Sequence, residues 1–141
     1  MSDRFSGTWR LVSFVGHGAD GRETTDYGPT PRGYLMYDKG GRMSVHITHS
    51  DRRPFKSGDP FRASPEELKD AFDKYFGYFG TYTVDESAGT VTHHVEGASN
   101  PNYVGTDQRR FFTWQGNRLA LSTPPGEGTG VTYIATWERQ P

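Results

Sequence analysis

Four side chains of this sequence would form a reaction centre if they shared one concave surface. His93 offers an imidazole whose ordinary pKa lies near neutrality, and such a group acts as a general base or a hydrogen-bond partner. Tyr82 and Tyr133 offer phenols that donate to a carbonyl or enolate oxygen, and Arg110 offers a guanidinium for a carboxylate or oxyanion. A base that faces such donors can abstract a proton next to a carbonyl. His93 and Tyr82 are therefore the candidate catalytic pair; alternatively, His93 is a buried histidine hydrogen-bonded to Tyr82 or Ser13.

The patterns that other chemistry requires are missing. The sequence has no Gly-x-Ser-x-Gly nucleophile elbow, no glycine-rich phosphate loop and no Gly-x-Gly-x-x-Gly fingerprint, which disfavours hydrolases, kinases and dehydrogenases. It has no cysteine, which excludes disulfides and thiolate sites. His46 and His49 face opposite sides of an expected strand, as do the adjacent His93 and His94, so neither pair can chelate one ion. We therefore expect no metal and no cofactor.

Length and charge restrict the class of protein. The chain has 141 residues, which suits a single domain over 1–141. Its 16 Lys and Arg residues against 17 Asp and Glu residues give a net charge of −1, unlike the basic domains that bind nucleic acid. Aromatic residues make up 14%, so the chain can bury a core. Without a long apolar run or a signal-peptide pattern, we expect a cytoplasmic protein that does not enter the membrane.

Apolar and polar residues alternate with period two along most of the chain, which predicts β-strands. The breaks at 38–41, 86–89 and 115–117 contain glycine and indicate hairpins. Many short strands with such turns form a sandwich or a barrel. The eight predicted strands cover 8–15, 33–38, 42–49, 79–85, 90–97, 107–114, 118–123 and 131–138.

The same alternation predicts which side chains point inward. In 90–97, Val91, His93 and Val95 share the apolar face. If residues 84 and 91 pair across the hairpin, Tyr82 lies directly opposite His93. The first strand directs Trp9, Leu11, Ser13 and Val15 inward.

The strand 33–38 has large residues on both faces, and Tyr34 and Met36 are its expected inner pair. An eight-stranded closed sheet is either filled by its side chains or holds one small ligand. The residues predicted to contact such a ligand are Tyr34, Met43, Val45, Tyr82, His93, Arg110, Phe112, Trp114 and Tyr133.

One segment has the period of a helix. Ser64-Pro65-Glu66-Glu67 combines a capping hydroxyl, a first-turn proline and a capping-box glutamate. Apolar residues then recur at spacings of three and four, and glycines at 77 and 80 end the run. Its aromatic face is expected to cover apolar surface, either at the barrel mouth or on the outer wall. The preceding loop, 50–63, mixes basic and aromatic residues and is more consistent with a solvated lid than with a site for single-stranded nucleic acid. The recurring apolar residues are Leu68, Ala71, Phe72, Tyr75, Phe76 and Phe79.

Several stretches carry a family resemblance. The first strand opens with GTWRLVS at 7–13, like the G-x-W start of lipocalin-type barrels. Further matching stretches are GRMSV at 41–45, YFGTYTVD at 78–85, GTVTHHVEG at 89–97, GTDQ at 105–108, LALST at 119–123 and the final WER at 137–139. On these residues the chain resembles the bacterial and fungal lipocalin-like domain family. The resemblance implies a calycin-type barrel closed at one end, with Trp9 plugging the base and Arg139 packing on it.

The predicted fold is thus an all-β, antiparallel, eight-stranded lipocalin-like (calycin-type) barrel with one short amphipathic helix between its third and fourth strands. The leading functional hypothesis is intracellular binding of a small, largely apolar molecule in the barrel. The first alternative is a cofactor-independent isomerase, cyclase or lyase of secondary metabolism that uses His93 and Tyr82. The second is a filled barrel that serves as an interaction module. The expected partner is a small hydrophobic molecule, with no nucleic acid and no membrane, and the protein is a monomer or a homodimer.

Overall fold

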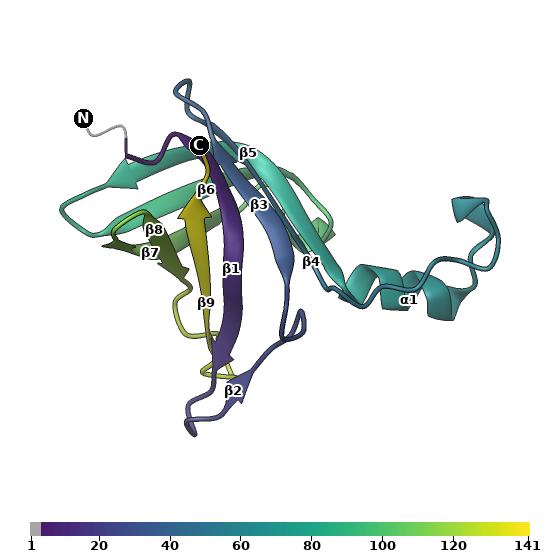
Figure 1. Ribbon diagram of the computed structural model, residues 1–141. Coiled ribbons are helices and arrows are strands. Elements are labelled where there is room, and N and C mark those ends of the chain that lie inside the picture. Colours follow the sequence, from purple (N-terminus) through teal and green to yellow (C-terminus); the bar gives the residue numbers. More distant parts are fainter. Residues whose placement is uncertain (1–3) are drawn as a thin grey trace.

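A closed antiparallel sheet dominates the fold (Figure 1). The computed structural model describes residues 4–141, and within them the strands pair in the order β2-β1-β3-β4-β5-β6-β7-β8-β9, with a further pairing of β1 to β9. Because β2 only extends the sheet beside β1 by two residues, the other eight strands form the barrel. The strands are β1 (Gly7–His17), β2 (Glu23–Thr24), β3 (Arg32–Tyr37), β4 (Arg42–Thr48), β5 (Tyr75–Asp85), β6 (Thr90–Ala98), β7 (Asp107–Gln115), β8 (Arg118–Ser122) and β9 (Thr132–Arg139).

The predicted eight-stranded barrel is confirmed, and each predicted strand differs from the observed one by four residues at most. Val91, His93 and Val95 are buried as the alternation in β6 indicated, and Tyr82 pairs directly with His93. Strand β2 is not among the predicted strands, because its two residues are too few to show a period.

The helix begins where it was predicted and ends earlier. At the N-terminus of α1 (Pro65–Asp73), the Ser64 hydroxyl accepts from the Glu67 N–H at 3.2 Å, and the Glu67 carboxylate accepts from the Ser64 N–H at 3.0 Å. Tyr75, Phe76 and Phe79 belong to β5, because β5 pairs with β4 from Tyr75 onward. The apolar spacing that continued the helical period is therefore part of a strand.

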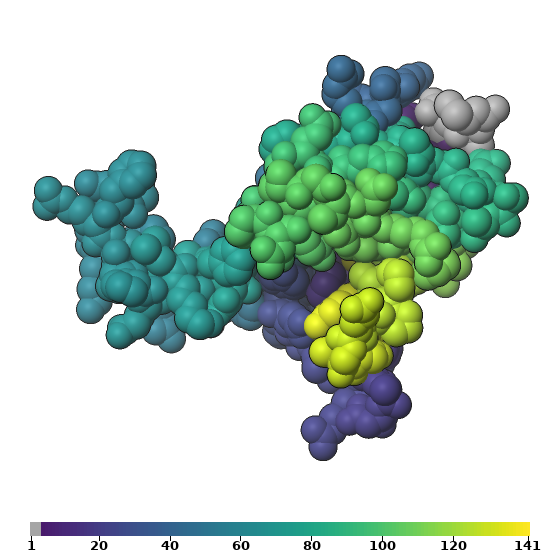
Figure 2. All heavy atoms as spheres, turned by 180° about the vertical axis from the view of Figure 1, so that it is seen from behind, coloured from purple at the N-terminus to yellow at the C-terminus, as the bar shows by residue number. Residues whose placement is uncertain are grey.

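The segment 50–74 projects away from the barrel (Figures 1 and 2). It contains α1 and the short 3₁₀ helix η1 (Pro60–Arg62). No residue of α1 is buried, and Leu68 and Phe72 remain about half exposed, at 50% and 51%. The expectation that this face covers apolar surface of the barrel is wrong. None of the helices within residues 4–141 is long and apolar enough to cross a membrane.

Strand β1 changes its inward face at a β-bulge. Trp9 and Leu11 point inward as predicted, but the register shifts between Leu11 and Ser13. A bulge adds one residue to a strand and exchanges its two faces beyond that point. Phe14 therefore points into the barrel, and the predicted inward orientation of Ser13 and Val15 is wrong.

The orientation predicted for β3 is also wrong. Tyr34 and Met36 are on the outer wall, 48% and 44% exposed, whereas Leu35 and Tyr37 are buried. Large side chains occupy both faces of this strand, so its own pattern does not define the inner one. The neighbouring strands define it instead, because Leu35 pairs with Trp9 on one side and with Val45 on the other.

A tryptophan seals one end of the barrel. Trp9 is buried, and the Arg139 guanidinium lies 4.2 Å from its ring centroid, as the family resemblance implied. Arg139 also donates to the carbonyl oxygen of Ser6 at 2.8 Å and to that of Arg4. Gly7 has φ of 134° and lies against the Arg139 side chain. A Cβ at position 7 would be 2.8 Å from the Arg139 guanidinium. The seal therefore depends on a small residue that tolerates positive φ.

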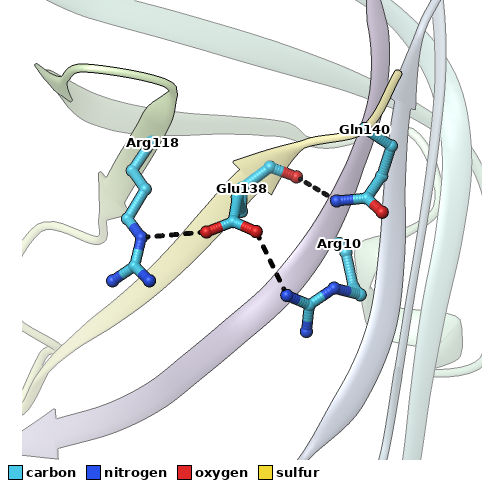
Figure 3. A network of polar contacts seen from close by, with 4 residues as sticks. All are labelled: Arg10, Arg118, Glu138 and Gln140. Carbon is cyan, nitrogen blue, oxygen red and sulfur yellow. Dashed lines mark hydrogen bonds and ion pairs between the residues drawn. The ribbon is translucent and has the colours of Figure 1, made fainter.

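The outer wall beside this seal carries a separate charged network. The Glu138 carboxylate accepts from Arg10 and Arg118 at 3.3 Å each, and the Glu138 carbonyl oxygen accepts from the Gln140 side chain at 3.0 Å (Figure 3). Exposed ion pairs of this kind contribute little to stability.

We expect Arg139→Ala to lower the free energy of unfolding by about 2 kcal/mol, because it removes a cation–π contact and charge-assisted hydrogen bonds to two carbonyl oxygens. Arg118→Ala is the matched control, since Arg118 is an arginine in an exposed pair on the neighbouring strand, and we expect a change below about 1 kcal/mol. Urea unfolding of both variants measures the difference. Equal effects would contradict the assigned role of Arg139.

Candidate ligand-binding cavity

The barrel contains a cavity of about 250 Å³. Strands on all sides of the barrel contribute side chains from their inward positions, and most of this wall is apolar. Figure 2 shows a hollow in the surface between the green and yellow parts of the chain. The apolar wall residues are Phe14, Leu35, Val45, Ile47, Phe76, Leu121, Ala135 and Trp137.

His93 lies in this wall between two tyrosines. It is 2% exposed, with Nε2 at 2.6 Å from the Tyr37 hydroxyl and Nδ1 at 2.5 Å from the Tyr78 hydroxyl. The expected hydrogen bond to Tyr82 or Ser13 is not the one observed. Tyr82 instead donates to the backbone oxygen of Asp38 at 2.8 Å, although its ring packs on Tyr37. His93 is thus a buried, hydrogen-bonded histidine, as the alternative to a catalytic role predicted. Its partners are Tyr37 and Tyr78, and not Tyr82 or Ser13.

Burial keeps this trio neutral. It lowers the pKa of His93 from 6.5 to about 3, an effect to which the Arg110 charge and His94 add. It raises the pKa of Tyr78 to about 12 and that of Tyr37 well above 10, while the nearby Arg110 acts in the opposite direction on both. The imidazole therefore stays uncharged at physiological pH, and both phenols keep their protons.

A neutral imidazole has one N–H and one lone pair. Both ring nitrogens of His93 are occupied by tyrosine hydroxyls, so whichever tautomer is present, one nitrogen donates and the other accepts within the trio. No basic nitrogen is left for a substrate. The arrangement fixes the positions of Tyr37 and Tyr78.

Neither of these tyrosines is among the residues predicted from the sequence to face the barrel interior. With Tyr34 and Met36 as the expected inner pair of β3, the alternation leaves Tyr37 on the opposite face. Tyr78 precedes the predicted fourth strand, and that strand begins earlier than expected, at Tyr75. The period of two residues in a strand could have identified Tyr78, because Tyr78, Gly80 and Tyr82 lie on the same face of one strand.

The open end of the cavity is polar. Asp26 is exposed and lines the cavity with Tyr27 and Tyr133. Burial and then the nearby Asp26 charge raise the pKa of Tyr27 to about 12. The pKa of Tyr133 is raised by burial and by the nearby Asp26 carboxylate. Tyr27 follows β2, and Tyr103 comes from the 3₁₀ helix η2 (Pro101–Tyr103), so no strand alternation identified either one.

Trp137 differs from the other buried polar groups. It is 1% exposed and forms part of the cavity wall, yet its Nε1–H has no hydrogen-bond partner among the described residues. The Trp9 Nε1–H, by contrast, donates to the Phe5 carbonyl at 2.9 Å. Leaving a buried donor unpaired costs about 1–3 kcal/mol, so such groups are rare in folded proteins.

The predicted contact residues divide into two groups. Val45, His93, Arg110 and Tyr133 lie in the cavity wall. Tyr34 is on the outer wall, and Tyr82 and Met43 are outside the cavity lining, with Met43 buried in the core.

Phe112 and Trp114 point inward but pack at the sealed end of the barrel. Phe5, which precedes β1, fills the space between them, with its ring centroid 5.0 Å from each of theirs. The sequence pattern could not place Phe5, because it lies outside any strand.

The histidines also bear on whether the chain could hold a metal ion. In the part of the chain from residue 4 onward, no three His, Asp or Glu side chains converge as a metal site requires. His94 faces outward as predicted, where its Nδ1 lies 2.7 Å from Asp107 and its Nε2 3.0 Å from Thr83. His46 Nδ1 lies 2.7 Å from the Tyr75 hydroxyl on the outer wall.

Comparison with known proteins agrees with this architecture. The sequence pattern of the lipocalin-like domain family matches residues 6–140. The 4'-hydroxy-3'-methoxypropiophenone carrier protein ppsC of Aspergillus oryzae (strain ATCC 42149 / RIB 40) is 39% identical over an alignment of length 108, which covers 70% of this chain and 97% of that protein.

Two solved structures share 16% identity with the chain at a TM-score of 0.43. They are a mutant of the fluorescent protein UnaG, covering 99% of this chain and 98% of its own, and fatty-acid-binding protein 1 of Echinococcus granulosus, covering 99% and 100%. The family pattern spans nearly the whole chain, and the fungal relative matches most of it. The protein therefore belongs to the lipocalin-like domain family.

Proposed function

We propose that the protein binds a small, largely apolar molecule inside the barrel. The observation that carries this proposal is the cavity of about 250 Å³ with its apolar wall and its few polar groups. Pockets for drug-sized ligands have about 300–1,000 Å³, so this volume suits a molecule of roughly one substituted ring. A filled barrel would leave no such space.

The fungal relative supports a ligand of this size. Its name describes a carrier of a single-ring compound with a ketone, a hydroxyl and a methoxyl group. Such a molecule matches a cavity that is mainly aromatic and aliphatic with polar groups at particular points. Aryl carbonyl compounds are therefore the first ligands to examine.

The geometry favours binding over turnover. Proton abstraction needs a basic atom within hydrogen-bond reach of the substrate. Both nitrogens of His93 are occupied by tyrosines, and Tyr82 lies outside the cavity lining. The residues of the candidate catalytic pair thus maintain the wall of the barrel, and the isomerase, cyclase or lyase alternative lacks a free base.

Filling the cavity tests the proposal. Ala135 lies in the wall between Phe14 and Leu121, so we expect Ala135→Trp to abolish binding by occupying the ligand's space. Ala120→Trp is the matched control, because Ala120 lies on the opposite face of β8 from the buried Leu119 and Leu121. Titration calorimetry with 4'-hydroxy-3'-methoxypropiophenone and related aryl ketones measures binding, and circular dichroism checks that both variants fold.

We expect saturable one-to-one binding by the wild type and by Ala120→Trp, and none by Ala135→Trp. If a folded Ala135→Trp variant binds as the wild type does, the ligand is not in this cavity. If the wild type binds no member of a panel of lipophilic single-ring compounds, the proposal fails.

The neutral state of His93 predicts how stability depends on pH. The folded pKa of about 3 lies below the ordinary value of 6.5, so between these values the unfolded chain binds more protons than the folded one. Stability due to His93 is therefore full above pH 6.5 and is lost as the pH falls, by up to about 1.4 kcal/mol per pH unit.

Urea unfolding between pH 7 and about pH 5 measures this slope, in a range where most carboxylates remain ionised. His93→Gln is the comparison, since glutamine does not titrate, and we expect a shallower slope for it. Equal slopes for the two proteins would show that His93 does not stay neutral in the fold.

A further inference from the structure

The indole N–H of Trp137 is a buried hydrogen-bond donor without a partner among the described residues. It is buried in the cavity wall, and within residues 4–141 it has no acceptor. The buried hydroxyls and ring nitrogens of Tyr37, Tyr78 and His93, by contrast, are all paired with one another. Trp137 thus carries hydrogen-bonding capacity that the fold itself does not use.

The pairing of β9 with β1 shows how far Trp137 lies from the sealed end of the barrel. Trp137 pairs with Leu11, two residues from the Trp9–Arg139 pair that seals the barrel. Tyr133 lies four residues earlier on β9 and lines the open end of the cavity together with Asp26. At about 3.3 Å per residue, these two positions are about 13 Å apart. Trp137, with its buried unpaired N–H, therefore belongs to the wall near the closed end, and Asp26 belongs to the wall at the rim.

We propose that the Trp137 N–H is the donor that selects the ligand, and that the ligand presents a carbonyl oxygen to it at the closed end. This inference rests on the proposed function. The opposite end of the ligand lies at the rim, where a hydroxyl group donates to the Asp26 carboxylate. The chemical class is a neutral ring compound with a carbonyl at one end and a hydroxyl at the other.

The surroundings favour a neutral carbonyl over an ionised acid. A buried carboxylate needs a cation to offset its lost hydration, and one indole N–H is a single neutral donor. Arg110, the cation of the wall, donates to the Arg109 carbonyl at 3.1 Å and lies near Tyr78, whose pKa its charge lowers. Trp137 differs from Arg110 in being uncharged and in having no acceptor among the described residues.

A cycle of two proteins and two ligands isolates this hydrogen bond. The proteins are the wild type and Trp137→Phe, and the ligands are 4'-hydroxypropiophenone and 4-propylphenol, in which a methylene replaces the carbonyl. Any space left by the smaller ring affects both ligands, whereas the lost N–H affects only the ketone. We expect the preference for the ketone to fall about tenfold in Trp137→Phe, as the loss of one hydrogen bond implies.

A second measurement needs no variant. In proton–nitrogen NMR spectra of the wild type, we expect the ketone to shift the indole N–H signal of Trp137 downfield, and 4-propylphenol to leave it nearly unchanged. The Trp9 N–H serves as the internal control, because it already donates to Phe5 and should respond to neither ligand.

The outcomes separate the two proposals. If neither ligand binds the wild type, the proposed function fails and this inference fails with it. If both bind and the ketone preference is the same in Trp137→Phe, or the Trp137 signal ignores the ketone, the inference alone is overturned. Tighter binding of 3-(4-hydroxyphenyl)propanoate than of the ketone would also overturn it, in favour of an anion site.

Discussion

The pairing of β1 with β9 is the contact on which the rest of the structure depends. It joins the two ends of the chain and closes the sheet, which places Trp9 beside Arg139 and Leu11 beside Trp137. The same pairing contains the bulge that turns Phe14 into the barrel. One long-range contact therefore builds both the sealed end and part of the cavity wall. In the closed order, each of the eight barrel strands has a paired neighbour on both sides.

A buried polar trio lies within this apolar interior without a net charge. Burying polar groups is costly unless every one of them is hydrogen-bonded, and His93 meets this condition with a tyrosine at each nitrogen. The trio connects β3, β5 and β6 through side chains. It gives the central histidine a structural role, because each of its ring nitrogens holds one phenol in place.

The sequence defined the features that depend on local pattern and left open those that depend on pairing. Alternation located the strands and the inward face of β6, because one face there is uniformly polar. It could not orient β3, where Leu35 and Tyr37 are buried only because Trp9 and Val45 lie beside Leu35. It also could not end α1 correctly, since the aromatic residues of β5 fit both periods. The errors about His93's partners follow directly from these two, because Tyr37 and Tyr78 lie on the misassigned segments.

The polar groups that face the cavity suggest how a small barrel recognises one molecule. Most of the wall contributes only apolar contact, which holds many ligands of similar size equally well. Discrimination then depends on few groups, and a buried polar group left unpaired rejects a ligand that lacks its complement more strongly than any apolar contact does. His93 and its tyrosines are satisfied internally, so they discriminate little. In the proposed binding mode, the buried N–H of Trp137 near the closed end supplies this discrimination, and the exposed Asp26 carboxylate at the rim sets the direction in which the ligand lies.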